Sequence, residues 1–135
     1  AGGGGGAGDA APTVPVGMTG GRVGKLVDGR QSALQLAITH GGDGERLGDL
    51  CDSSEEEAMK SHFSVVREFV GHGVGRKLHE EPQVPNYGKR KRLMKLTLGL
   101  TIAIEPMVSV GTAKTRTMPD RWTVVTADGS RASYF

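Results

Sequence analysis

Phe69-Val-Gly-His-Gly-Val-Gly-Arg-Lys-Leu-His-Glu-Glu-Pro82 is the stretch around which this 135-residue sequence is organised. His72 and His79 lie in or beside a run of three alternating glycines. Because glycine allows a backbone to approach a ligand closely and to adopt a positive φ, the run predicts a rigid loop that presents imidazoles at a site. Imidazole is a common ligand of divalent metals, and carboxylates are its usual partners in hydrolytic sites. The first hypothesis is therefore a metal-assisted hydrolase.

Glu105 is the downstream carboxylate that could complete such a site. It lies within the apolar segment Ile102–Val108, where an unpaired carboxylate has a large desolvation cost. We therefore expect it to be paired, protonated or bound to a metal. His72 alone would more often be a turn histidine, but its glycine neighbours have no side chains to pack against it, which favours a ligand. By composition alone, His79 with the two glutamates after it is better explained as a surface loop.

The composition bounds the class of protein. A net charge of +2 does not by itself indicate a nucleic-acid or membrane partner. The single cysteine, Cys51, excludes an internal disulfide and is typical of a reducing compartment. No apolar run reaches transmembrane length. We expect a soluble cytoplasmic protein with no membrane partner, and an organellar location stays open.

Domain organisation is expected to be simple. Residues 1–22 are rich in glycine, alanine and proline, which predicts a flexible leader. Residues 23–135 are then one folded domain, a length that can bury a modest core.

Two helices are predicted at the start of this domain. Over residues 25–40, Leu34, Ala37 and Ile38 form the apolar stripe of an amphipathic helix, which the glycine run 41–44 ends.

A second helix is predicted over residues 46–61. Ser53 and Ser54 resemble an N-cap, and Glu55–Glu57 would follow as a solvated acidic face in the first turn. After these helices the pattern changes to β-branched residues and turns. We expect strands over residues 63–70, around Glu105 within 98–110, over 114–118 and over 122–126, with 81–88 a turn-rich connector. Two helices followed by an antiparallel sheet define an α+β fold.

Familiar motifs of other enzyme classes are absent. Gly71–Gly75 is not the dinucleotide-binding G-x-G-x-x-G, and Gly21–Lys25 lacks the spacing of a phosphate-binding P-loop. The histidine and glutamates at 79–81 do not form the H-E-x-x-H of helical zinc proteases.

Long ordered motifs resemble type I methionine aminopeptidases over about residues 26–135. These motifs are Val65-Val-Arg-Glu-Phe-Val-Gly-His-Gly-Val-Gly-Arg-Lys-Leu-His-Glu-Glu-Pro-Gln-Val-Pro-Asn-Tyr-Gly88, Thr101-Ile-Ala-Ile-Glu-Pro-Met-Val108, Arg116-Thr-Met118, Asp120-Arg-Trp-Thr-Val124, Asp128-Gly-Ser130 and Arg46-Leu-Gly-Asp49. The resemblance implies a pita-bread (creatinase/aminopeptidase-like) fold, of which this chain covers the second half. It also implies hydrolysis of the peptide bond after an N-terminal methionine, by water activated between two divalent cations (Co, Mn, Fe or Zn).

Site residues follow from the same resemblance. His72 and Glu105 match metal ligands, His79 matches the histidine that contacts the scissile peptide and steadies developing charge, and Trp122 matches an aromatic residue near the methionine pocket. An ordinary core tryptophan is the alternative for Trp122. The family's two aspartate ligands lie upstream of the first helix, where Asp9 is the only acid, and its last glutamate ligand follows the position of Phe135.

With His72 and Glu105 alone, we expect the isolated chain to bind metal poorly and to be inactive or weak, since a metal site needs ligand number and geometry together. A separate chain could supply the other half. The alternative from another class is a non-catalytic remnant that binds ribosomes or proteins. Its candidate surface is the basic run Lys89, Arg90, Lys91 and Arg92, which could contact RNA phosphates without sequence specificity, although a solvated loop is the simpler explanation.

Overall fold

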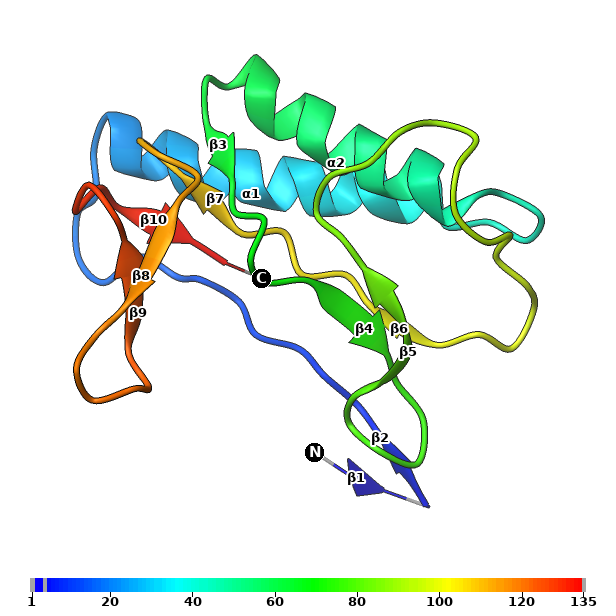
Figure 1. Cartoon of the computed structure of the whole chain (residues 1–135). Coiled ribbons are helices and arrows are strands. Elements are labelled where there is room, and N and C mark those ends of the chain that lie inside the picture. The colour runs from blue at the N-terminus through cyan, green and yellow to red at the C-terminus, as the bar shows by residue number, and fades with distance from the viewer. Residues whose placement is uncertain (1, 4, 135) are drawn as a thin grey trace.

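A pair of antiparallel helices covers one side of several small sheets in the computed structural model, which describes residues 2–3 and 5–134 (Figure 1). α1 spans Arg22–Thr39 and α2 spans Leu47–Lys60, so both predicted helices are confirmed. No helix among these residues is long and apolar enough to cross a membrane.

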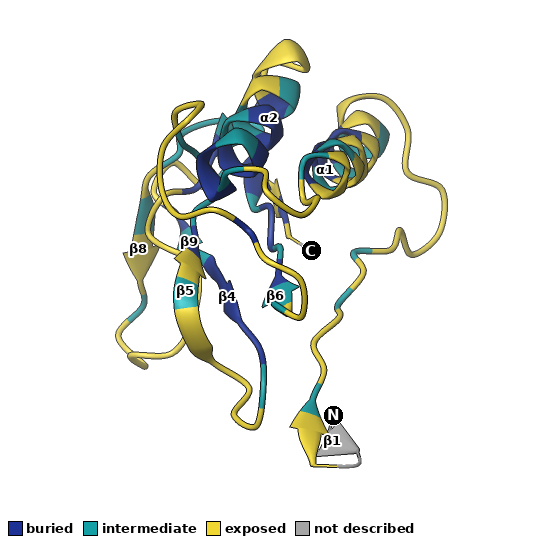
Figure 2. Ribbon diagram, turned by 90° about the vertical axis from the view of Figure 1, so that its right-hand side faces the viewer, coloured by how far each residue is buried: buried dark blue, intermediate teal, exposed yellow. Residues whose placement is uncertain are grey.

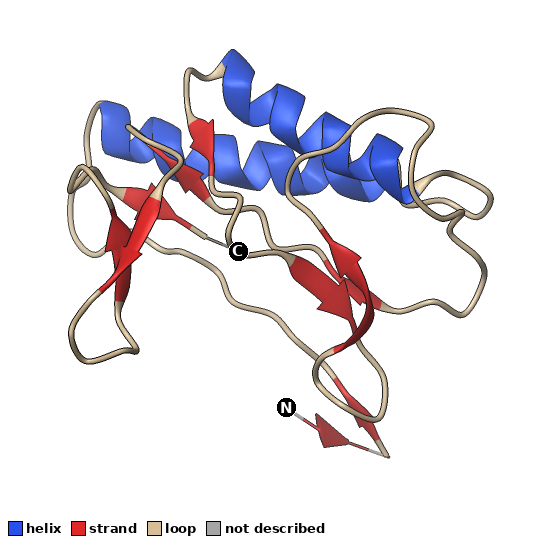
Figure 3. Cartoon of the chain, in the orientation of Figure 1, coloured by secondary structure: helices blue, strands red, loops and turns tan. Residues whose placement is uncertain are grey.

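The strands lie on the other side of the helix pair and form two three-stranded antiparallel sheets (Figure 3). One has the order β5-β4-β6, with bounds Glu80–Val84, Gly71–Gly73 and Ile102–Ala103. The other has the order β10-β7-β3, with bounds Ala132–Ser133, Val108–Ser109 and Ser64–Val65. The expected α+β class is confirmed, although the strands do not form one continuous sheet.

Two further strand pairs lie outside these sheets. β8 (Thr115–Thr117) and β9 (Val124–Thr126) pair as an antiparallel hairpin, which confirms the two strands predicted there. Near the N-terminus, β1 (Gly2–Gly3) pairs with β2 (Gly6–Ala7).

Buried residues gather where the helices and the sheets face one another (Figure 2). One cluster lies between the helix pair and the β4 sheet, and the other lies between the helix pair and the β7 sheet. The first comprises Ala37, Leu47, Leu50, Cys51, Val84 and Leu96, and the second comprises Leu26, Ala58, Phe63, Val65 and Val108. Because the two clusters lie under opposite ends of the helices, the helix pair joins the two sheets into one unit.

The buried face of α1 differs from the predicted stripe. Ala37 is buried as expected, but Ile38 is 50% exposed. The face that packs inward comprises Leu26, Gly29, Arg30, Ala33 and Ala37. Gly29 lets the helix lie close to Phe63, because a Cβ added at this position would lie 2.9 Å from the Phe63 ring. Close approach of the helix to Phe63 therefore decides which face turns inward, and a hydrophobicity pattern does not show this.

The start of α2 is held by a loop rather than by a serine cap. Arg46 is the N-cap residue, and Ser53 and Ser54 are buried inside the helix, so the predicted cap was wrong. The N–H of Leu47 donates to the carbonyl of Met94 at 3.0 Å, and that of Gly48 donates to Arg92 at 3.1 Å. These carbonyls satisfy helix N–H groups that have no partner within the helix.

Three other expectations about the strands need correction. The connector predicted at 81–88 contains β5, and the strand predicted over 63–70 is limited to Ser64–Val65. Glu105 lies between β6 and β7 rather than in a strand. β5 and β3 extend only where a neighbouring strand pairs with them, and the segment that contains Glu105 has no such partner among the described residues.

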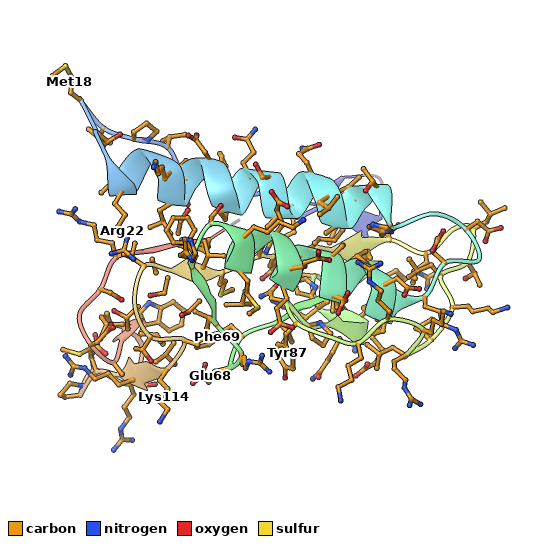
Figure 4. All side chains as sticks on the ribbon, turned by 90° about the horizontal axis from the view of Figure 1, so that it is seen from above. Met18, Arg22, Glu68, Phe69, Tyr87 and Lys114 are labelled. Atoms are coloured by element: carbon orange, nitrogen blue, oxygen red, sulfur yellow. The ribbon has the colours of Figure 1, made fainter. Side chains whose placement is uncertain are left out.

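The N-terminal segment runs in extended form past the β4 sheet toward the start of α1 (Figure 1). The N–H of Ala7 donates to the carbonyl of Gly75 at 2.8 Å, and the hydroxyl of Thr13 donates to the carbonyl of Tyr134 at 2.5 Å. Further along, the side chain of Met18 projects fully into solvent (Figure 4). The predicted domain boundary at residue 22 stays a prediction, but this segment contacts the folded part.

Candidate metal centre

His72 is fixed in the middle of β4, the central strand of its sheet. Its register partners are Gln83 on β5 and Ala103 on β6, and the residue is only 7% exposed. Nδ1 lies 2.8 Å from the carbonyl oxygen of Gly73. A carbonyl only accepts, so Nδ1 has the proton, and Nε2 presents a lone pair whenever the ring is neutral.

The glycines beside His72 allow the strands to approach one another. A Cβ at Gly71 would overlap the carbonyl oxygen of Ala103 on β6, and a Cβ at Gly73 would overlap the carbonyl oxygen of Glu81 on β5. Neither glycine has a positive φ. The positive φ offered as a reason for these glycines is absent at both, and they are needed for close packing between strands.

Glu105 faces Nε2 of His72 from the irregular segment between β6 and β7. Its Oε1 lies 3.0 Å from Nε2, and the residue is 7% exposed. Burial raises the pKa of Glu105 above its ordinary value, His72 opposes this increase, and the nearby Asp9 adds to it. His72 thus lies within ion-pair distance of this carboxylate, and whether Glu105 is paired, protonated or bound to a metal stays a prediction.

Asp9 joins the two residues from the N-terminal segment. Its Oδ2 lies 3.5 Å from Nε2 of His72, and its side chain is 23% exposed. Ligand atoms of Asp9, His72 and Glu105 all lie within 4.8 Å of one another. Asp9 is therefore a possible third ligand, which the expectation of His72 and Glu105 alone did not include. Asp9 was visible as the only acid before the first helix, but its glycine-rich surroundings gave no signal of where the chain would lead.

This donor set fits a divalent cation. Despite its 3.0 Å distance to Glu105, Nε2 of His72 makes no hydrogen bond of acceptable geometry among the described residues. A buried lone pair that faces two carboxylates is electrostatically unfavourable, and a cation between them relieves this. The Nδ1–H···O=C bond is also how metal-binding histidines are commonly oriented. One imidazole and two carboxylates suit Zn²⁺, Mn²⁺, Fe²⁺ or Co²⁺.

His79 lies beside the metal-ligand group without belonging to it. Its ring centroid is 4.1 Å from that of His72, with the rings tilted by 50°. The residue is exposed, in the loop that precedes β5. This position, next to the group and open to solvent, is suited to contact with a bound substrate.

Trp122 is separate from these residues and lies in the connection of the β8–β9 hairpin. It is 88% exposed, so the alternative of a core tryptophan was wrong. Its side chain lines an apolar groove with Phe69, Met107 and Tyr134.

The basic run is partly neutralised by α2. Arg90 forms ion pairs with Asp52 at 2.8 Å and Glu56 at 2.9 Å, and the N–H of Lys91 donates to Asp49. Lys89, Lys91 and Arg92 are exposed. The acidic face of α2 thus binds this loop instead of being wholly solvated as predicted.

Comparison with known proteins places these features in context. The sequence pattern of metallopeptidase family M24 matches residues 1–128. Methionine aminopeptidase 1 of Bacillus subtilis is 41% identical over 128 residues, which are 95% of this chain and 52% of that protein. Methionine aminopeptidase of Aquifex aeolicus is 44% identical over 131 residues, 96% of this chain and 51% of that protein.

Solved structures show the same likeness. The crystal structure of methionine aminopeptidase from Thermotoga maritima superposes with a TM-score of 0.87 at 46% identity, covering 89% of this chain and 48% of that chain. The expected pita-bread fold is confirmed by this neighbour. This chain spans about half the length of the curated relatives it matches.

Proposed function

This chain belongs to metallopeptidase family M24, and on that premise we propose that it provides part of the active site of a methionine aminopeptidase. In this proposal, Asp9, His72 and Glu105 hold a divalent cation and His79 contacts the peptide. The observation that supports it most is the buried, unpartnered Nε2 of His72 facing two carboxylates. A bound metal would lower the pKa of a water molecule bound to it, and its positive charge would polarise the scissile carbonyl.

The roles of the two histidines differ in this proposal. His72 is oriented by its Nδ1–H bond to Gly73, so its Nε2 is available only toward the carboxylates. His79 is exposed and free to donate an N–H to a substrate carbonyl beside the cluster. Donation to the oxygen on which charge develops is the contribution expected of such a histidine.

Trp122 is proposed to contact the substrate's methionine side chain through the apolar groove it lines with Phe69 and Tyr134. A thioether packs favourably against aromatic rings. The substrate class is therefore a peptide with an N-terminal methionine, such as a nascent chain. The expected cytoplasmic location stays a prediction.

Metal titration tests the proposal. Addition of Co²⁺ to the 135-residue chain should give the visible absorption of a protein-bound ion, and Asp9→Asn, His72→Ala or Glu105→Gln should each weaken binding at least about tenfold. His79→Ala should bind Co²⁺ as the parent does but bind a Met-Gly-Met peptide more weakly in the presence of Mn²⁺. Equal Co²⁺ affinity in the parent and His72→Ala would refute the metal centre. Loss of Co²⁺ binding in His79→Ala would refute the division of roles.

A further inference from the structure

A cavity of about 650 Å³ lies between the N-terminal segment, α1 and the β6 region. Ala10–Val14 form one wall, and apolar side chains of α1 and residues Ile102–Ile104 form the others. Thr13, Gln31 and Gln35 add neutral polar groups, and Asp9 is at the edge shared with the metal-ligand group. The lining is mainly apolar, which suits a ligand with a hydrocarbon body.

Arg30 provides a buried positive charge in this cavity. The residue lies on the inward face of α1 and is only 5% exposed. Its Nε has no hydrogen-bond partner, and no carboxylate among the described residues forms an ion pair with it. Burial lowers the pKa of the Arg30 guanidinium below its ordinary value.

A buried guanidinium without a counter-charge is costly, because an arginine stays protonated at any ordinary pH. Natural structures pair such a charge or place it against an anionic ligand. The planar group presents N–H donors in a geometry that matches a carboxylate. The charge of Arg30 thus favours a ligand with an anionic group, and the apolar lining favours a ligand with a hydrocarbon body.

We propose that this cavity binds an organic carboxylate with an apolar body, whose carboxylate pairs with Arg30. Arg30 is not part of the Asp9–His72–Glu105 group, although Asp9 belongs to that group and also lines the cavity. Asp9 disfavours a second negative charge at its own edge of the cavity, which directs the carboxylate of the ligand toward Arg30.

Hexanoate is the probe, and binding to the 135-residue chain is measured by calorimetry and by the shift in unfolding temperature. Hexan-1-ol keeps the apolar body without the charge, and inorganic phosphate keeps the charge without the body. Arg30→Met removes the charge but keeps an apolar stem, and Arg30→Lys keeps a charge. Arg116→Met makes the same chemical change at an exposed position on β8.

Hexanoate should bind the parent, Arg116→Met and Arg30→Lys. Its affinity for Arg30→Met should be lower by roughly tenfold or more, the loss expected for a charge-assisted hydrogen bond. It should also raise the unfolding temperature of the parent. Hexan-1-ol or phosphate binding as tightly as hexanoate would overturn the proposal, as would no hexanoate binding to the parent. If Arg30→Met does not fold, these three ligands compared on the parent still decide it.

Discussion

Replacing Gly71 by alanine tests how the metal-ligand group is held together. Gly71 lies on β4 directly before His72, and the added Cβ would overlap the carbonyl oxygen of Ala103 on β6 and lie 3.2 Å from its carbon. It would also lie 3.3 Å from the backbone nitrogen of Glu105. Both neighbours are backbone, so they cannot move aside by changing a rotamer. β4 and β6 must separate instead.

The expected cost follows from that separation. Overpacking typically costs about 1 to 3 kcal/mol, and the upper end applies here because backbone must move. For a domain of this size, about 3 kcal/mol corresponds to a decrease in unfolding temperature of roughly 10 °C. Separation of the strands by about 1 Å would also pull Glu105 from His72, while metal–ligand distances tolerate only about 0.2 Å. Co²⁺ affinity should therefore fall by roughly tenfold or more.

Thermal unfolding followed by circular dichroism and Co²⁺ titration measure the two effects in one preparation. Gly20→Ala is the matched control, because a Cβ there meets no atom within 4 Å and its φ is not positive. We expect that control to match the parent in both measurements. A Gly71→Ala protein with the parent's unfolding temperature and Co²⁺ affinity would refute the argument that close packing of β4 on β6 positions the ligands.

Three further predictions concern activity, pH and the basic run. With Co²⁺ or Mn²⁺, the 135-residue chain should release no methionine from Met-Gly-Met above a His72→Ala control, because the described residues offer ligands for one cation; clear His72-dependent release would contradict this. A side-chain hydrogen bond from Ser130, with the N–H of Thr112, lowers the pKa of Asp128 from 3.8 to about 2. The ionised Asp128 therefore contributes to the free energy of unfolding above pH 3.8, and this contribution is lost as pH falls through about 2. In this window the free energy of unfolding of the parent should depend more on pH than that of Asp128→Asn. Equal pH dependence in the two proteins would show that Asp128 does not stabilise the fold in this way. Lys89, Lys91 and Arg92 can be changed to glutamine while Arg90 is kept for its ion pairs to α2. This change should abolish any ribosome co-sedimentation seen at low salt, and raising the salt concentration should do the same. Association that survives both changes would count against contact with RNA phosphates.

Local sequence patterns determined much of this fold. The apolar period and the glycine stop located α1, and segments rich in β-branched residues located β8 and β9. The uncommon spacing of histidines and glycines, with a carboxylate in an apolar segment, identified His72 and Glu105 as a candidate pair. These features could be read from the sequence because propensity, periodicity and burial cost are properties of a few neighbouring residues.

Only the tertiary structure decided which distant residues meet. It brought Asp9 across 63 positions to His72 and placed Arg30 beside a cavity where no acid of residues 2–3 and 5–134 pairs with it. It also explains why the residues beside His72 are glycines, because Gly71 and Gly73 lie against carbonyl groups of two other strands and leave no room for a Cβ. A sequence pattern cannot specify such meetings, because they depend on the register of paired strands and on the course of an extended segment. Both are fixed by packing between elements far apart in the chain.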